Sequence, residues 1–169
     1  TFLEKHINII DFNNLSHNIY IPLSFLEQHL DLFNFYALSE NAGIPLAFFE
    51  KHIVQVKWKC ICINTSIPIS FFEEHINKVN WKSICENESI PLSFFEEHID
   101  KVNFDHMSYN SKIPTSFYDK YSDRLNESNW EDLGEKINLD VLFCNKYIDK
   151  LNFGSEPNFL PYVPRFFPN

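Results

Sequence analysis

IPLSFFEEHIDKVNF, residues 90–104, is the stretch that decides the fold, because related copies of it recur along the chain. These copies begin at Ile21, Ile44, Ile67 and Ile113, and each full copy starts 23 residues after the one before it, apart from a later insertion. Self-similarity at a fixed period of about 20 to 50 residues is the sequence signature of repeat architectures. Positions in the repeat are counted from this isoleucine, which is position one.

The apolar positions of the repeat follow the period of a helix. In the copy that begins at Ile90 they are positions five, six, ten and thirteen, which hold Phe94, Phe95, Ile99 and Val102. Spacings of three and four residues place side chains on one face of an α-helix, whereas a strand needs a spacing of two. Position five is phenylalanine throughout: Phe2, Phe25, Phe48, Phe71, Phe94, Phe117 and, by alignment, Phe143. The pattern therefore predicts a helix, named helix A, in the first half of each repeat.

Two starting points fit the residues before helix A. Ser93 at position four is followed three residues later by Glu96, and this spacing is that of a capping box. It predicts that helix A begins near position four and runs for about ten residues, a length that is marginal for an isolated helix. The alternative is a start one turn earlier, with Pro91 at position two as the first helical residue.

The second half of each repeat predicts a shorter helix, named helix B. Position fourteen is usually Asn or Asp, which are good N-terminal caps. Position fifteen is always aromatic, as at Trp81, and position eighteen is apolar, as at Ile84. An asparagine at position twenty-one, such as Asn87, is expected to end the helix in the left-handed conformation. Helix B is thus predicted to have about two turns and to be partly 3₁₀.

The repeats extend over residues 1–153, and we predict a single all-α domain, an α-solenoid of tandem 23-residue helix pairs. One such unit cannot enclose its own phenylalanines, so stacking must bury them against neighbouring units. A three-residue insertion, residues 126–128, keeps Trp130 in register. The predicted units are a partial repeat 1–20, repeats 21–43, 44–66, 67–89, 90–112 and 113–138, and a partial repeat 139–153. Residues 154–169 contain four prolines and are predicted to form a cap on the last repeat or an extended arm.

The composition is that of a folded, acidic protein. Hydrophobic residues make up 44% of the chain, and 23 acidic against 14 basic residues give a net charge of −9. This balance argues against nucleic-acid binding. The chain has no apolar run of the about 18 to 20 residues that a membrane span needs, and no signal-peptide pattern opens it. Four cysteines, Cys60, Cys62, Cys85 and Cys144, lack the framework of a secreted disulfide domain, which predicts reduced thiols and a cytoplasmic location.

Five histidines form a column at position nine, and they are the first candidates for metal ligands. They are His6, His29, His52, His75 and His98. A straight column offers at most two converging nitrogens between neighbours, while zinc takes three or four protein ligands. Tyr121 and Tyr147, which are poor zinc ligands, hold the position in the last two copies. We therefore predict a structural column that packs and hydrogen-bonds, with no metal and no cofactor.

The sequence contains no catalytic motif. A Gly-rich phosphate loop, GxSxG and HExxH are all missing, and the Cys60 and Cys62 pair has no second pair at ligand spacing. Paired glutamates such as Glu96 and Glu97 fall on the predicted solvated face of helix A. We predict that the protein is not an enzyme and that it binds no small-molecule substrate, nucleic acid or membrane.

A known class of repeat shares these features. NWKSICENESIPLSFFEEHIDKVN, residues 80–103, resembles the short two-helix tandem repeats of uncharacterised proteins from large DNA viruses that infect amoebae. The shared pattern is an Asn-containing turn, Ile-Pro, a Phe-rich helix ending in His-Ile-Asp-Lys, and Asn followed by an aromatic residue. More distantly, the repeat is similar to leucine-rich variant repeats, in which an α-helix alternates with a 3₁₀ helix. The resemblance implies a viral repeat scaffold in the host cytoplasm or virion, without a defined activity.

The positions that break the pattern on the surface predict a binding site. Position twelve is apolar at Ile9 and Leu32, position eleven is apolar at Val54, and Tyr36 stands where later copies have lysine. Exposed apolar strips mark interfaces, so these four residues are predicted to bind protein; cover by polypeptide preceding Thr1 is the alternative. The predicted function is a non-catalytic scaffold for protein–protein interaction. The alternative is a self-assembling virion or filament protein that stacks through its open ends.

Overall fold

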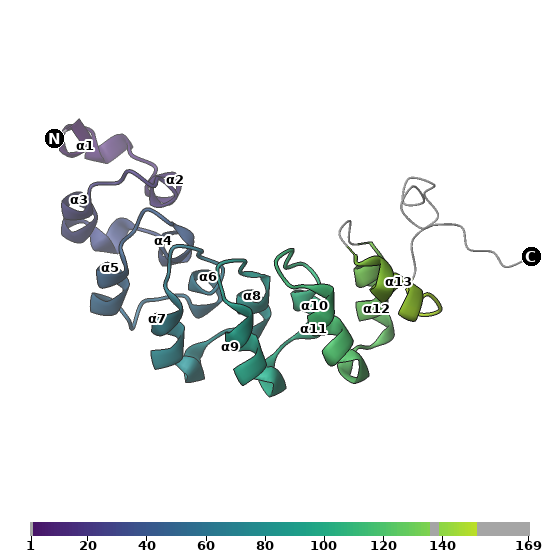
Figure 1. Ribbon diagram of the computed structural model, residues 1–169. Helices are drawn as coiled ribbons and strands as arrows, with labels where there is room; N and C mark the ends of the chain where they lie inside the picture. Colours follow the sequence, from purple (N-terminus) through teal and green to yellow (C-terminus); the bar gives the residue numbers. More distant parts are fainter. Residues whose placement is uncertain (1, 136–138, 152–169) are drawn as a thin grey trace, which may run out of the picture.

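The computed structural model describes residues 2–135 and 139–151, and within these residues the regular structure is helical throughout, without a strand. The all-α class predicted from the sequence is therefore confirmed. The helices follow one another in a curved row, with α4, α6 and α8 on the inner side of the bend and α5, α7 and α9 on the outer side (Figure 1). None of the described helices is long and apolar enough to cross a membrane.

The outer series of helices corresponds to helix A. It consists of α1 (Phe2–Lys5), α3 (Leu23–Gln28), α5 (Leu46–Lys51), α7 (Ile69–Glu74), α9 (Leu92–Glu97), α11 (Thr115–Lys120) and α13 (Val141–Lys146). From α3 onward each has six residues, so the predicted length of about ten is wrong. The reason lies at position nine, where the backbone leaves the α conformation, as at His98 with φ −113° and ψ 33°.

Short 3₁₀ segments follow most of these helices. They are η1 (Ile7–Ile9), η2 (Leu30–Leu32), η3 (Ile76–Lys78), η4 (Ile99–Lys101) and η5 (Ser122–Arg124). The sequence predicted 3₁₀ structure in helix B, whereas the structure has it in the turn between the two helices. This turn lets the position-ten and position-thirteen side chains, such as Ile99 and Val102, pack against the core although the helix has already ended.

The N-cap of helix A is proline in α3, α5, α7, α9 and α11, where no capping box forms, whereas Asp140 caps α13. Pro91 is the N-cap of α9, and its carbonyl accepts a hydrogen bond from the backbone N–H of Phe94 at 3.1 Å. The first helical residue, Leu92, is at position three, one residue from each of the two predicted starts, and the predicted capping box is wrong. Proline suits this place because its fixed φ directs the chain into the first turn. The acid at position seven contacts the following repeat instead at Glu4, Glu27, Glu96 and Asp119.

The inner series corresponds to helix B. It consists of α2 (Phe12–Ser16), α4 (Phe35–Glu40), α6 (Trp58–Ile61), α8 (Trp81–Glu86), α10 (Phe104–Met107) and α12 (Glu127–Gly134). The predicted caps at position fourteen are confirmed, since the side chains of Asn34, Asn80 and Asn103 each accept a backbone N–H of their own helix. The inserted residues lengthen α12 at its start, with Asn126 as N-cap. Packing runs along the series, with α4 on α6, α8 on α10 and α10 on α12.

Buried asparagines at position twenty-one form a ladder that joins each repeat to the one before it. The Asn87 side-chain amide donates to the carbonyl of Cys62 at 2.8 Å and to that of Asn64 at 3.4 Å. The same asparagine accepts the backbone N–H of Ser89 at 2.9 Å. Asn87 has φ −76° and ψ 108°, so the predicted left-handed conformation is wrong. An extended backbone instead aims the amide at the carbonyl of Cys62, the C-cap of α6, and at that of Asn64, which also accepts the backbone N–H of Ile67.

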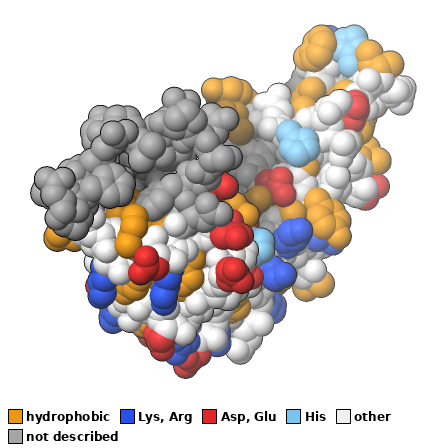
Figure 2. Space-filling model, turned by 90° about the vertical axis from the view of Figure 1, so that its right-hand side faces the viewer, with side chains coloured by type: hydrophobic (Ala, Val, Ile, Leu, Met, Phe, Trp, Pro, Cys, Tyr) orange, Lys and Arg blue, Asp and Glu red, His pale blue; other side chains and the backbone are white. Residues whose placement is uncertain are grey.

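The core lies between the two series of helices. Side chains at position six are inaccessible to solvent, as at Leu26, Phe49, Phe72 and Phe95, and burial of each such side chain contributes about 1.5 to 3 kcal/mol. The surface is not uniform. Figure 2 shows the N-terminal end, at the top of the molecule, with hydrophobic and histidine side chains and few charges, while acidic and basic side chains alternate over the lower part.

Candidate binding groove

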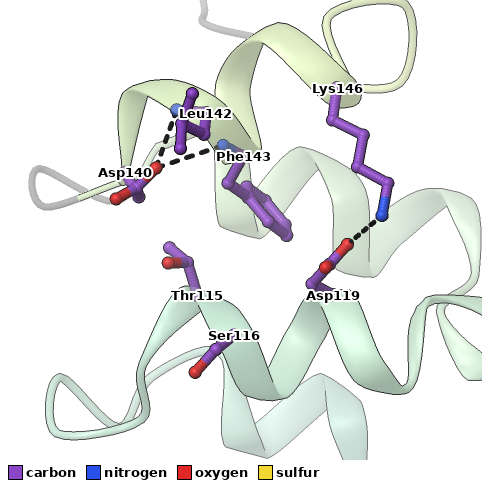
Figure 3. Close-up of a pocket in the computed structure, with 7 residues that line it drawn as sticks. All are labelled: Thr115, Ser116, Asp119, Asp140, Leu142, Phe143 and Lys146. Carbon is purple, nitrogen blue, oxygen red and sulfur yellow. Dashed lines mark hydrogen bonds and ion pairs between the residues drawn. The ribbon is translucent and has the colours of Figure 1, made fainter.

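Two hollows are candidates for a binding site, and the smaller lies between α11 and α13 (Figure 3). It measures about 260 Å³, and its charged side chains already have partners. Asp119 accepts hydrogen bonds from Lys146 at 2.6 Å and from the Tyr147 hydroxyl at 2.7 Å. Asp140 caps α13 by accepting the backbone N–H of Leu142 at 2.7 Å. These contacts hold two repeats together and leave little polar capacity for a ligand.

The larger hollow is a groove of about 680 Å³ on helix B of four successive repeats, which we name the inner groove. Its lining includes Tyr36, Lys59, Ile63, Lys82, Glu86 and His106. Positions sixteen and twenty supply most of these side chains, because residues four apart lie on one face of a helix. The inner groove therefore follows the row of repeats and crosses the helices that form it.

The apolar part of the inner groove is Tyr36 and Ile63. Their side chains are 61% and 40% exposed, so each has apolar surface that a ligand could cover. The Lys57 ammonium lies 5.1 Å from the centroid of the Tyr36 ring, a cation–π contact that holds the ring in place. Tyr36 thus offers a fixed aromatic surface beside a positive charge.

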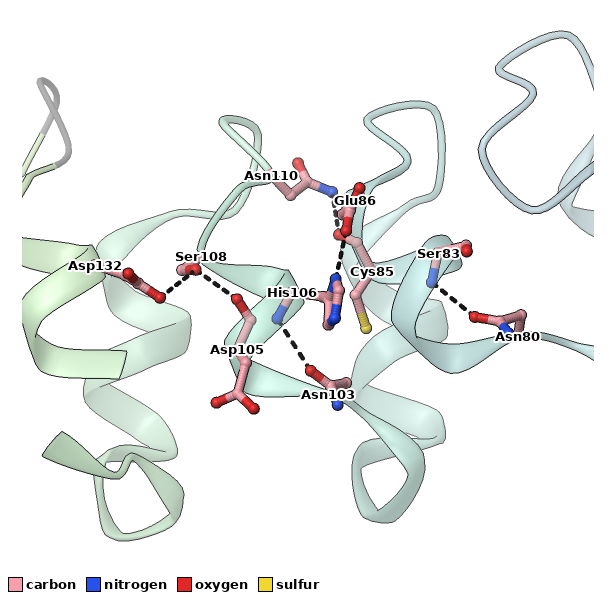
Figure 4. A network of polar contacts seen from close by, with 10 residues as sticks. All are labelled: Asn80, Ser83, Cys85, Glu86, Asn103, Asp105, His106, Ser108, Asn110 and Asp132. Atoms are coloured by element: carbon pink, nitrogen blue, oxygen red, sulfur yellow. Dashed lines mark hydrogen bonds and ion pairs between the residues drawn. The ribbon is translucent and has the colours of Figure 1, made fainter. Parts of the chain in front are cut away.

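The acids of the inner groove are engaged by neighbours within it. The Glu86 carboxylate contacts Nδ1 of His106 in the next repeat (Figure 4). The Glu40 carboxylate hydrogen-bonds with Cys60, and burial together with this contact raises the pKa of the Cys60 thiol to about 11. A thiol with so high a pKa is almost wholly protonated near neutral pH and is a poor nucleophile.

The lysines of the inner groove are in the opposite situation. Lys59 and Lys82 are exposed at position sixteen of α6 and α8, and neither has an ion-pair partner within the part of the chain that the structure describes. Lysines of the outer helices are paired, with Lys51 bound to Glu27 at 2.7 Å and Lys120 to Glu96 at 2.7 Å. The ammonium groups of Lys59 and Lys82 are therefore available for an ionic contact with a ligand, although the two glutamates of the lining balance their formal charge.

The column at position sixteen changes sign beyond the inner groove. Asp105 and Glu131 take the place of the two lysines in the following repeats. Asp105 already accepts hydrogen bonds from the side chains of Asn126 at 3.2 Å and Asn129 at 2.6 Å. Ser108 adds a link to Asp132 at 3.2 Å (Figure 4). The acidic end of the column is thus used to join repeats.

The structure does not bring the four predicted binding residues together in the inner groove. Tyr36 lies there, whereas Ile9 and Leu32 belong to η1 and η2 and Val54 follows α5. These three side chains are 81%, 45% and 96% exposed, so they remain available on the turns between helices A and B. In the sequence, Lys59 and Lys82 stand out only as the residues that Tyr36 replaces, although the spacing of positions sixteen and twenty could have marked the groove face.

The histidine side chains at position nine pack at the edge of the hydrophobic core. Each of the five histidines lies against the phenylalanine at position five of its own repeat, with centroid distances from 4.4 Å at His6 to 5.0 Å at His98. Two histidines contact the acid of the preceding repeat: His29 Nε2 lies 3.2 Å from Glu4, and His52 Nε2 lies 3.1 Å from Glu27. Within the described residues, no three His, Cys, Asp or Glu side chains are grouped so that they could hold a metal ion.

Comparisons of the chain with family models, with curated proteins and with solved structures found no match in any of the three. A functional proposal for this chain therefore rests on its geometry and charge alone.

Proposed function

We propose that the protein is an α-solenoid of tandem helix pairs that acts as a non-catalytic scaffold and binds a segment of a partner protein in its inner groove. The observation that carries this proposal is an open groove that combines exposed apolar surface at Tyr36 and Ile63 with two lysines that have no ion-pair partner among the described residues. Peptide segments are recognised by such mixtures of an apolar contact and oriented charge.

The hydrogen bonds between repeats support the solenoid part of the proposal. Asn41, Asn64, Asn87 and Asn110 each donate to a carbonyl 25 residues earlier in the chain. Such a constant separation is expected when each unit contacts mainly its neighbours. A ladder of this kind also holds the groove residues of successive repeats in fixed register, which lowers the entropic cost of binding.

The groove itself argues for binding without catalysis. Two side chains of its lining that could act as nucleophile or base, Cys60 and His106, each contact a glutamate of the preceding helix B. Burial keeps the Cys60 thiol protonated, with its pKa at about 11. Nothing in this arrangement prepares a nucleophile beside a free base, as covalent catalysis requires.

Affinity capture with matched variants tests the proposed function. Wild-type protein, the groove variant Tyr36→Ala and the outer-surface variant Lys51→Gln would be immobilised in parallel, and bound proteins identified by mass spectrometry. We expect a partner that the wild type and Lys51→Gln retain equally and that the groove variant loses, followed by at least a tenfold difference in Kd by calorimetry, about 1.4 kcal/mol. Equal capture by all three would reject the inner groove as the binding site.

Self-assembly is the second candidate, in which the exposed ring of Phe2 would be covered by another copy of the chain and not by polypeptide preceding Thr1. Phe2 is 75% exposed, whereas phenylalanines at this position in later repeats are buried against a neighbour. The last helix A, α13, is a poorer match for stacking on another copy. In some other repeats an acid at position seven contacts a histidine or tyrosine of the next repeat, whereas α13 has Asn145 at this position. Light scattering across a wide concentration range separates the candidates: a constant 20.1 kDa supports the scaffold, and a mass that rises with concentration supports assembly.

A further inference from the structure

We propose that the segment bound in the inner groove is an extended acidic peptide, with carboxylates on Lys59 and Lys82 and an apolar side chain on Tyr36. The inference rests on the proposed function and adds the chemistry of the partner. It is based on which charged side chains of the groove already have contacts among the described residues and which do not.

Every acid in the lining of the inner groove has a partner inside it, and its two position-sixteen lysines have none among the described residues. Glu40 is bound by Cys60 and Glu86 by His106, so a cationic ligand would have to displace an existing contact. An anionic ligand meets Lys59 and Lys82 without displacing anything that the structure records. The lining holds two lysines and two glutamates, so an acidic ligand is favoured by the lysines that have no ion-pair contact among the described residues and not by a net positive charge of the groove.

The spacing of the two lysines selects an extended ligand. Lys59 and Lys82 are the second residues of α6 and α8, one repeat apart. Packed helices lie about 8 to 10 Å apart. A polyproline II segment has three residues per turn and rises about 3.1 Å per residue, so side chains three residues apart project from one side about 9 Å apart. Carboxylates at every third residue of such a segment match the two lysines.

Tyr36 supplies the remaining contact. Its ring is exposed, lies beside the lysines in the same groove and is held by Lys57. Grooves lined by aromatic side chains bind polyproline II segments, because the bound conformation is already populated in the free peptide. A ligand with proline or another apolar residue between its acids can therefore cover Tyr36 while its carboxylates reach the lysines.

A single-stranded nucleic acid is the other polyanion to consider, and the groove suits it less. Sequence-independent binding of single strands relies on successive aromatic side chains on which bases stack. The aromatic residues at position fifteen are not free for this, since Trp58 and Trp81 stack on Phe71 and Phe94 at 5.6 Å and 5.5 Å. Tyr36 is the one Phe, Tyr or Trp in the lining that the structure records for the groove.

Fluorescence anisotropy with three matched peptides tests the inference. The probes are fluorescein-labelled peptides of four Glu-Pro-Pro, Gln-Pro-Pro or Lys-Pro-Pro triplets, with labelled oligothymidylate as a fourth probe. We expect the glutamate peptide to bind at least tenfold more tightly than the other three probes, and its affinity to fall as salt is raised, since exposed charges are screened. Lys59→Gln and Lys82→Gln should each weaken binding several-fold, and the double variant at least tenfold.

The outer variant Lys146→Gln is the matched control, because it removes the same charge from a lysine already bound to Asp119. Circular dichroism would verify that each variant remains folded. Equal binding of the three peptides, no binding, an unaffected double variant or tighter binding of oligothymidylate would each overturn the inference. The proposed function would stand in those cases if affinity capture still showed a partner lost by Tyr36→Ala, so the two failures are distinguishable.

Discussion

The repeats before residue 67 and those after it share a core but differ on their surface. Residues 1–66 contain six acidic and four basic side chains, whereas residues 67–169 contain seventeen and ten. Of the large hydrophobic side chains that the structure records as exposed, nine belong to the first part and four to the second. They are Phe2, Ile9, Ile19, Tyr20, Leu23, Leu32, Tyr36, Val54 and Ile63, against Tyr109, Val141, Leu142 and Ile148.

This difference shows which positions of the repeat are free to vary. Positions five, six and twenty-one are buried wherever a neighbour packs on them, so stacking holds them constant in both parts. Positions twelve and sixteen face solvent, and they change from Ile9, Leu32 and Tyr36 in the first part to charged side chains further along. Positions eleven and twenty also face solvent, but without such a trend. Specific binding is therefore expected from the first part and from the groove at its junction with the second, while the charged second part supplies solubility and contacts between repeats.

The largest expected effect tests whether the two parts have equivalent cores. Phe49→Ala and Phe72→Ala remove the same fully buried ring at position six, one in each part. Each should lower the free energy of unfolding by about 3 to 5 kcal/mol, because a buried ring is replaced by a cavity. Urea unfolding followed by circular dichroism measures both losses. A difference of more than about 1 kcal/mol between the two losses would exceed the usual context dependence of such changes. It would mean that the two cores are not equivalent.

The next effect concerns the asparagine ladder. Asn87→Asp keeps the acceptor for the Ser89 N–H but removes the donor to Cys62 and places a carboxylate at a position only 2% exposed. We expect a loss of about 2 to 3 kcal/mol in thermal or urea unfolding. Asn18→Asp is the matched control, since Asn18 is exposed and uses its oxygen to accept the Tyr20 N–H at 2.9 Å. A similar loss in both variants would show that the ladder is not what matters.

A smaller change in stability is expected at alkaline pH. It concerns the repeats that have cysteine, and not serine, at position nineteen. Burial raises the pKa of Cys62 to about 11 and that of Cys85 to about 12. The unfolded chain loses these protons near pH 9 while the folded chain keeps them. The contribution of these two thiols to the free energy of unfolding is therefore fully present below about pH 8.5. It is lost as pH rises through the folded pKa values, by roughly 2 kcal/mol for each thiol at pH 11.

Serine at the same two positions should remove this dependence. Ser39 already accepts the backbone N–H of Lys57 at 3.1 Å, as the Cys62 sulfur accepts that of Asn80 at 3.3 Å. The double variant Cys62→Ser and Cys85→Ser should therefore stay folded and lose less stability than the wild type between about pH 8.5 and 11. Urea unfolding at a series of pH values measures it. Parallel pH profiles would contradict the assignment to these thiols.

The smallest effect concerns the exposed residues predicted from the sequence. Leu32→Glu and Val54→Glu change side chains on the turns of the first part, and each should alter the free energy of unfolding by less than about 0.5 kcal/mol. Binding of the captured partner, measured by calorimetry with both variants, then separates two surfaces. Weaker binding would extend the interface from the inner groove to these turns, while unchanged binding would confine it to the groove.

The sequence allowed the helical class and the order of the helix pairs to be predicted, because both depend on the spacing of buried side chains. Trp130, which follows the predicted insertion 126–128, stacks on Phe143 as Trp81 does on Phe94, so its place in the repeat agrees with the packing, although the N-cap of α12 is Asn126, within the inserted residues. The predicted cap or arm at residues 154–169 lies outside the residues that the structure describes.

The errors have a common physical origin in contacts between repeats. Glu96 was assigned to a local capping box, but it binds Lys120 in the next repeat. Asn87 was assigned to a local left-handed cap, but its amide bonds to carbonyls 23 and 25 residues away. The groove was missed because the availability of Lys59 depends on which acids in other repeats are already engaged. Local patterns cannot reveal such partners.

The asparagine ladder has a mechanical consequence. Each rung joins only two neighbouring units, so a force applied between the ends of the chain is carried by the rungs in series. Under such a load the weakest rung would open first and release one unit of 23 residues, or about 80 Å of extended chain, while the remaining units stay folded. In an optical trap the molecule would lengthen in repeated small steps and not in one large rupture.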